Sequence, residues 1–245
     1  MPRANRYFVP RQIWHITHRC HNRDFLFRSI DDRTYWMRWL YHAKNRFNIS
    51  ILNYIVTCNH IHLLISDTEG GSKIPEFMQL LQGRTAQDYN LRRNRKGAFW
   101  EDRYHATAVE SGEHVRKCMT YISMNMVRAG IVDNPLKWKE SGFYEIQHPK
   151  KRYVILDYSE INKVFSFENV KQLQKNQQEW VNDALEQKEL QRDRRWTEAI
   201  AVGSKNYLET FSKQLGLRAQ FRTIRKDGEY YELSEAEIPY NQNLY

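Results

Sequence analysis

The stretch TCNHIHLLI, residues 57–65, places two histidines two residues apart inside an apolar run. If this run is a β-strand, alternate side chains point to the same face of a sheet. His60 and His62 then share one face, and the aliphatic residues between and after them line the other. Because histidine is a common ligand of divalent cations, two imidazoles directed at one point indicate a metal site.

A metal site of this kind needs a third ligand. Tyr121 and Asn125 lie four residues apart, on one face of a helix that we expect to begin after Ser111 and to end at Gly130. Two imidazoles favour Zn or Mn, whereas the addition of an amide oxygen and phosphate oxygens favours Mn or Mg. The sequence therefore predicts a divalent cation with open coordination positions.

The same helix supplies a candidate nucleophile. A cation with open positions can bind a phosphodiester and polarise its phosphorus toward attack. Tyr121, one helical turn before Asn125, is then placed to attack that phosphorus. Because the ordinary pKa of tyrosine is about 10, the cation and the nearby Lys117 or Arg128 would have to favour the phenolate.

Hydrophobic periodicity predicts the elements around the histidine strand. The expected elements are strands at residues 12–18, 48–57, 57–65 and 99–109 and helices at residues 31–46 and 72–90. Ser72 is positioned to cap the second helix, and a tight turn at residues 58–59 makes a hairpin. The order β-α-β-β-α-β is that of the ferredoxin-like split βαβ fold, an α+β fold with an antiparallel sheet and helices on one face.

The positive charge lies in the first part of the chain. Residues 1–150 carry 23 Lys and Arg against 14 Asp and Glu, whereas residues 151–245 carry 15 against 15, so the net charge of +9 (23 − 14 = 9) belongs to the first part. This asymmetry is typical of a polyanion-binding surface; the alternative is a solvated basic face without a ligand.

Three further observations concern the setting of the protein. The longest apolar runs are far shorter than the roughly 18 residues of a membrane span. The first residues are followed by no apolar signal core, and the three cysteines are scattered, as in reduced thiols. We therefore expect a cytoplasmic protein without a membrane partner.

Several of these stretches together resemble one protein family. NHIHLL at residues 59–64, FWEDRY at residues 99–104 and YISMNMVRAG at residues 121–130 are similar to motifs of single-tyrosine HUH transposases of the IS200/IS605 type. WHITHR at residues 14–19 is similar as well, so the resemblance spans roughly residues 7–145. Within the family, the sequence looks closest to the branch associated with repetitive extragenic palindromes, or REPs.

The resemblance implies a ferredoxin-like fold and a Mg or Mn ion bound by His60, His62 and Asn125. It also implies that Tyr121 cleaves single-stranded DNA beside a hairpin, leaving a 5′-phosphotyrosine link and a free 3′-hydroxyl. The insertion-sequence enzymes are dimers and the REP-associated branch can act as monomers, so a monomer or a homodimer is expected.

The sequence predicts that the chain has two parts. We expect residues 1–148 to form the catalytic domain and residues 149–245 to form a C-terminal extension of unknown role. Within the extension, residues 165–195 are predicted to be a polar helix or helical linker, and residues 196–217 a helix with a break at 203–204. A hairpin is predicted around Asp227-Gly228.

The basic residues of the first part are the predicted DNA contacts. Arg and Lys bind the phosphate backbone, and exposed aromatic rings stack on unpaired bases. The predicted nucleic-acid-binding residues are Arg19, Asn22, Arg23, Arg84, Arg92, Arg93, Arg95, Lys96, Arg103, Lys117 and Arg128.

Each assignment has an alternative. His60 and His62 could be hydrogen-bonded strand histidines without a metal, and Tyr121 could be an amphipathic helix-flank residue. Four other histidines, His15, His18, His21 and His105, are interpreted as structural or surface residues rather than as ligands. At the level of function, the alternatives are a domesticated module that binds DNA or RNA hairpins without cutting and a metal-dependent phosphoesterase without a covalent intermediate.

Overall fold

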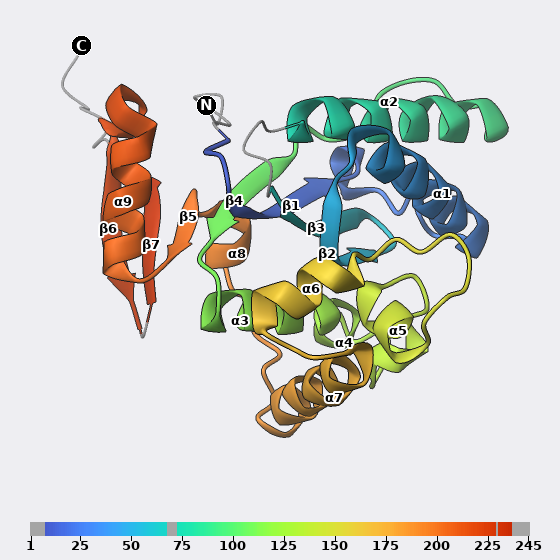
Figure 1. Cartoon of the computed structure of the whole chain (residues 1–245). Helices are drawn as coiled ribbons and strands as arrows, with labels where there is room; N and C mark the ends of the chain where they lie inside the picture. Colours follow the sequence, from blue (N-terminus) through green and yellow to red (C-terminus); the bar gives the residue numbers. More distant parts are fainter. Residues whose placement is uncertain (1–7, 68–72, 229, 237–245) are drawn as a thin grey trace, which may run out of the picture.

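The structure, a computed structural model, describes residues 8–67, 73–228 and 230–236 of the 245 residues. Helices surround one seven-stranded sheet, in which the strands follow the order β2-β3-β1-β4-β5-β7-β6 (Figure 1). The α+β class that the sequence predicted is confirmed. Among the described residues, no helix is long and apolar enough to cross a membrane.

The first part of the chain has the predicted element order. Its elements are β1 (Ile13–Arg19), the short 3-10 helix η1 (His21–Arg23), α1 (Ile30–Phe47), β2 (Ser50–Val56), β3 (His60–Ser66), α2 (Ile74–Arg92) and β4 (His105–Val109). The four strands pair antiparallel in the order β2-β3-β1-β4, as the ferredoxin-like fold requires. Ser72, the predicted cap of α2, lies outside the described residues.

The fourth strand is shorter than predicted. Pairing with β1 continues from His105 to Val109, and a single bridge joins Trp100 to Cys20. Between these points residues 101–104 are not part of a strand. Just before the bridge, Phe99 is buried against Phe27 with ring centroids 5.1 Å apart. The aromatic residues that suggested a strand thus anchor a loop.

The helix predicted at residues 111–130 consists of α3 (Glu113–Ser123) and α4 (Asn125–Arg128), with a break at Met124. Just before the break, the Ser123 hydroxyl donates to the backbone carbonyl of Met119 at 2.9 Å, a carbonyl that would otherwise accept only from the helix backbone. A serine that bonds back to residue i−4 tends to bend a helix. The predicted terminator Gly130 has a φ of 67°, in the left-handed region.

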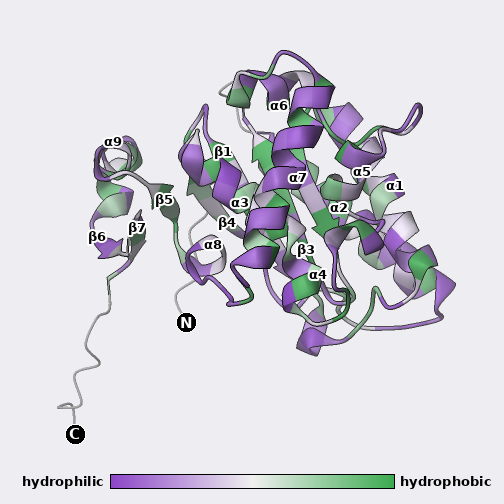
Figure 2. Ribbon diagram, turned by 90° about the horizontal axis from the view of Figure 1, so that it is seen from below, coloured by the Kyte–Doolittle hydropathy of each residue, from purple (hydrophilic) through white to green (hydrophobic). Residues whose placement is uncertain are grey.

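Four short elements and one long helix lead out of the first part. They are the 3-10 helix η2 (Pro135–Lys137), α5 (Gly142–Gln147), α6 (Tyr158–Phe165), α7 (Val170–Glu186) and α8 (Arg195–Glu198). Helix α7 is polar over most of its surface, as predicted, and Figure 2 shows its hydrophilic outer side. It buries Leu173, Val181 and Ala184 and contacts α3 and α5, so it is packed on the molecule.

The last part of the chain extends the sheet. Strand β5 (Ala201–Gly203) pairs parallel with β4, β7 (Tyr230–Glu235) pairs antiparallel with β5, and β6 (Arg222–Asp227) pairs with β7. The predicted hairpin is therefore present, whereas the helix predicted at residues 196–217 is replaced by α8, β5, α9 (Lys205–Leu215) and η3 (Gly216–Ala219). Residues 201–203 form a strand because the free edge of β4 satisfies their backbone groups. The division at residue 148 stays a prediction about folding units, although the sheet runs across it.

Asn53 fixes helix α3 to the sheet. It is fully buried on β2, next to a register shift between Ile51 and Asn53. Its Nδ2 donates to the Met119 carbonyl at 3.1 Å, and its Oδ1 accepts from the Tyr54 N–H at 2.9 Å. The Asn53 amide thus forms hydrogen bonds with backbone groups of both α3 and β2.

The substitution Asn53→Ala should lower the free energy of unfolding by about 2–4 kcal/mol, because it removes two buried hydrogen bonds and leaves a cavity in place of the amide. Urea denaturation measures this loss. Asn206→Ala, at an exposed position of α9, is the control and should stay within about 0.5 kcal/mol of the wild type. Equal effects of the two substitutions would contradict the anchoring role of Asn53.

Candidate active site

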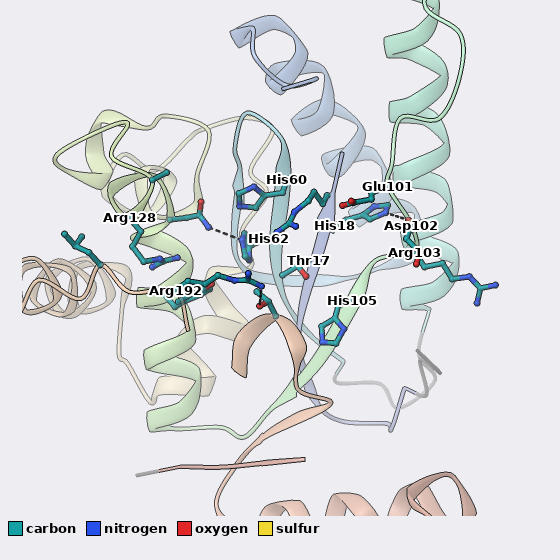
Figure 3. Close-up of a pocket in the computed structure, with 16 residues that line it drawn as sticks. Thr17, His18, His60, His62, Glu101, Asp102, Arg103, His105, Arg128 and Arg192 are labelled. Atoms are coloured by element: carbon teal, nitrogen blue, oxygen red, sulfur yellow. Dashed lines mark hydrogen bonds between the residues drawn. The ribbon is translucent and has the colours of Figure 1, made fainter. Parts of the chain in front are cut away.

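The strand period places the histidine pair as predicted. His60 and His62 extend from β3 toward α3 and α4, which cover this face of the sheet (Figure 3). Asn125, the first residue of α4, donates from Nδ2 to His62 Nε2 at 3.0 Å. The structure therefore brings together the three side chains that the sequence selected as metal ligands.

The hydrogen bonds of His60 determine which of its nitrogens is free. His60 Nδ1 lies 2.7 Å from Asn59 Oδ1 and 2.9 Å from Thr57 Oγ1. An amide oxygen only accepts hydrogen bonds, so Nδ1 carries the proton and Nε2 keeps its lone pair. Burial, followed by the charge of Arg19, lowers the pKa of His60 to about 4, so this lone pair is available at neutral pH.

His62 is held by a residue that the sequence analysis set aside. His15 is fully buried on β1, and its Nε2 lies 2.8 Å from His62 Nδ1. On its other side, His15 Nδ1 lies 2.8 Å from the carbonyl oxygen of Trp196. Burial, followed by the neighbouring His15 and His60, lowers the pKa of His62 well below its ordinary value.

The donor set fits a divalent cation. Two imidazole nitrogens and one amide converge here, a combination used for cations that also take phosphate oxygens. The described residues contain no group of three or more His, Cys, Asp and Glu side chains that could hold a metal. For the part of the chain that the structure covers, this mixed set is therefore the candidate metal site.

Tyr121, on α3, lies beside the histidine pair of β3. Its ring centroid is 6.0 Å from that of His62, and the Arg128 guanidinium lies over the ring at 3.9 Å from its centroid. Burial raises the pKa of Tyr121, while the charges of Arg128 and Arg192 act in the opposite direction. The phenol is thus protonated at neutral pH but lies next to cations that would stabilise its anion.

A cavity of about 580 Å³ opens over these side chains (Figure 3). Its lining includes the loop that follows Trp100 and the four candidate active-site residues, His60, His62, Tyr121 and Asn125. Among the predicted DNA contacts, the cavity brings in Arg19, Arg103 and Arg128. A second cavity of about 760 Å³ shares Tyr121, Arg128 and Arg192 with the first and also includes Lys117.

The basic turn after α2 has partners within the molecule. Arg92 Nη1 and Arg93 Nη2 donate to the buried carboxylate of Asp32 at 2.8 and 2.7 Å. Burial raises the pKa of Asp32, but the bonds from Arg93, Ser29 and Arg92 outweigh it and lower the pKa. Part of the charge assigned to DNA binding therefore stabilises the contact between α1 and α2.

The remaining predicted contacts lie away from the cavities. Arg95 donates to the Ala98 carbonyl at 2.9 Å, and the Arg84 guanidinium lies 5.7 Å from the centre of the Trp39 ring. The other three, Asn22, Arg23 and Lys96, are exposed on η1 and in the turn after α2. Their contact with nucleic acid stays a prediction.

Residues 187–198 contribute to the site, although their sequence pattern predicted no such role. This segment brings Arg192 and the carbonyl of Trp196 to the site, where Arg192 lines both cavities. The sequence predicts a polar helix or helical linker up to residue 195 and the start of a further helix at residue 196. The signal present in the sequence was the cluster RDRRW at residues 192–196, which combines three arginines with a tryptophan.

Comparisons with known proteins concern the family and the fold. Residues 8–125 match the family model described as "Transposase IS200 like". A solved structure described as a REP-associated tyrosine transposase bound to a REP hairpin is similar at 18% identity and a TM-score of 0.52, covering 65% of this chain and 96% of that one. At that identity the likeness concerns the fold.

A second solved structure, described as a transposase from Deinococcus radiodurans R1, has 18% identity and a TM-score of 0.36, covering 50% of this chain and 96% of that one. A search among curated proteins found no match to this chain.

The buried histidines predict how stability depends on pH. Burial lowers the pKa of His15 to about 3, whereas an unfolded histidine takes up a proton near pH 6.5. The unfolded state therefore binds more protons as the pH falls below about 6.5, and the stabilisation by neutral His15 is progressively lost down to its folded pKa. At pH 5 the loss for this histidine is about 2 kcal/mol.

Urea denaturation at pH 7.5 and 5.0 measures this effect. His15→Gln, which lacks a titrating group, should lose about 2 kcal/mol less than the wild type over that interval. The same pH dependence in both proteins would contradict a neutral, buried His15.

Proposed function

Residues 8–125 belong to the IS200-like transposase family, and we propose from this membership that the chain nicks and rejoins single-stranded DNA with Tyr121 as nucleophile. One observation carries the proposal. His62 Nε2 and Asn125 lie 3.0 Å apart, with His60 beside them and Tyr121 on the same cavity wall. These are the parts that a metal-assisted transesterification by tyrosine needs.

A Mg or Mn ion held by His60, His62 and Asn125 would neutralise the phosphate oxygens and polarise the phosphorus. The two imidazoles would supply their Nε2 lone pairs. Asn125 at present directs Nδ2 toward His62, and a half-turn of the amide about Cβ–Cγ exchanges Nδ2 for Oδ1. Asn125 is therefore the ligand that would reorient on cation binding.

Tyr121 would carry out the covalent step. Its Oη forms a bond to phosphorus, the bond from phosphorus to the 3′-oxygen breaks, and the phenol proton ends on that oxygen. Arg128 and Arg192 oppose the effect of burial on the pKa of Tyr121 and thus favour the attacking anion. The 5′-phosphotyrosine keeps the free energy of the phosphodiester, so a 3′-hydroxyl can reverse the step without ATP.

The proposed substrate is single-stranded DNA that carries a hairpin. Support comes from the basic lining of the cavity, where Arg19, Arg103 and Arg128 lie, and from the fold shared with a protein described as bound to a REP hairpin. We propose a member of the REP-associated branch that acts in the cytoplasm as a monomer or homodimer.

The substitution Tyr121→Phe should abolish the covalent protein–DNA adduct, because it removes the attacking oxygen. The assay is denaturing electrophoresis after incubation with labelled hairpin DNA and Mn or Mg. His60→Ala and His62→Ala should reduce the adduct by at least about a hundredfold. Tyr144→Phe, at a tyrosine stacked on His148 and absent from the lining of both cavities, is the matched control and should form adduct normally.

The same assay separates the rival functions. A binding module would shift hairpins in a native gel without forming an adduct, in the wild type and in Tyr121→Phe alike. A phosphoesterase would release cleaved DNA and leave no adduct. Either pattern would overturn the nucleophilic role of Tyr121.

Hairpin affinity tests the basic surface. Arg103→Glu should weaken binding by about tenfold at moderate salt, since a contact with phosphate is lost and a like charge is introduced. Lys213→Glu on α9, exposed and remote from the cavities, makes the same change of charge and should have little effect. Arg103 is a cleaner test than Arg92 or Arg93, because reversing either of those removes one ion pair of the buried Asp32 and places a like charge beside it.

A further inference from the structure

A chain of hydrogen bonds leads from the C-terminal extension to the candidate metal site. It begins at the carbonyl oxygen of Trp196, passes through both nitrogens of His15, and reaches His62 Nδ1, with 2.8 Å at each of the two contacts. The planes of the two imidazole rings are nearly parallel, at 9°. Beyond His62, Nε2 faces Asn125 at 3.0 Å.

The position of each proton in this chain follows from its first member. A carbonyl oxygen only accepts, so His15 Nδ1 must carry a proton and donate it to Trp196. His15 Nε2 is then the acceptor, and His62 Nδ1 must donate to it. The remaining nitrogen, His62 Nε2, is left with a lone pair that points at Asn125.

The surroundings support neutral rings in this arrangement. The exposed fractions of His15 and His62 are 0% and 2%. Among the described residues, no acidic side chain donates to or accepts from either ring. Two buried imidazoles that share one hydrogen bond need one donor and one acceptor nitrogen, and the carbonyl decides which ring is which.

We propose that His15 is a positioning residue that, with the backbone carbonyl of Trp196, holds His62 in the tautomer whose Nε2 can bind a divalent cation. This inference rests on the proposed metal site of the transposase. It assigns a role to the C-terminal extension, since the residue that ends the chain of hydrogen bonds lies there. In the other tautomer, Nε2 carries a proton and cannot ligate.

The carbonyl of Trp196 is fixed in space by the added part of the sheet. The Trp196 ring is buried, with an exposed fraction of 3%. Three residues later, the Ala199 carbonyl accepts from Thr107 Oγ1 at 2.7 Å, and Ala108 N–H donates to the Ile200 carbonyl at 2.9 Å. Thr107 also lies opposite His15 in the pairing of β1 with β4. The same residue therefore holds both the extension and the hydrogen-bonded series Trp196–His15–His62, which is called the relay below.

The experiment compares two substitutions of His15. Glutamine can reproduce the relay, because its amide nitrogen donates to the Trp196 carbonyl and its amide oxygen accepts from His62 Nδ1. Phenylalanine keeps the ring volume but can do neither. The readouts are the dissociation constant for Mn²⁺ by titration calorimetry and the ¹⁵N chemical shifts of the His62 ring, neither of which requires DNA cleavage.

We expect His15→Phe to bind Mn²⁺ at least about tenfold more weakly than the wild type and His15→Gln to stay within about threefold. The control is His114→Gln, which changes a half-buried histidine of α3 that is paired with Glu110. This variant should bind Mn²⁺ like the wild type. In the wild type without metal, the nitrogen shifts should show a protonated Nδ1 and an unprotonated Nε2 in His62.

Three results would overturn the relay. They are wild-type affinity in His15→Phe, an equal loss in both His15 variants, and a protonated Nε2 of His62 in the wild type. If His15→Phe does not fold, the His15→Gln affinity and the wild-type shifts still decide. A missing DNA adduct with normal Mn²⁺ binding would refute the proposed nickase and leave the relay standing.

Discussion

The antiparallel register between β1 and β3 is the constraint on which the site depends. It sets Thr17 opposite His62 and Leu64 opposite His15, so that the two histidines lie diagonally on one face. Diagonal neighbours in an antiparallel pair come within reach of long or aromatic side chains. A slip of one residue would turn the histidines of one strand to the opposite face and separate the pair.

The buried aliphatic residues of β3 enforce this register. Leu63, Leu64 and Ile65 are fully buried, so any slip would exchange apolar side chains for polar ones inside the sheet. The apolar content that makes β3 recognisable as a strand is therefore also what orients His62. Stability and site geometry share the same cause here.

Local spacing explains why part of the site could be predicted. His60 and His62 are two residues apart on a strand, and Tyr121 and Asn125 are four apart on a helix, so neighbouring positions fix their faces. The ferredoxin-like order follows from the same periodicities. Both kinds of inference use only residues close together in the sequence.

The remainder depends on contacts between distant residues. The break at Met124 involves Asn53, about seventy positions earlier, and the basic turn is paired with an aspartate about sixty positions earlier. His15 contacts the Trp196 carbonyl, 181 positions later in the chain. Sequence periodicity shows that a residue is polar or buried, but it contains no information about such partners.

The charge balance of the cavity constrains how the proposed site would fill. Its candidate ligands, two neutral imidazoles and an amide, bring no negative charge. The cavity lining carries four arginines against two carboxylates, Glu101 and Asp102, so positive charge is in excess. A divalent cation alone would therefore enter against a net repulsion.

A phosphodiester changes that balance, because its oxygens supply both negative charge and ligands. Cation and DNA should then each raise the affinity for the other by the same factor, as linkage requires. Under this scheme the two imidazoles must be preorganised, with their lone pairs directed into the site, before either partner contributes, whereas Asn125 would reorient as the cation binds. A relay that keeps the His62 lone pair in place provides that preorganisation through the fold alone.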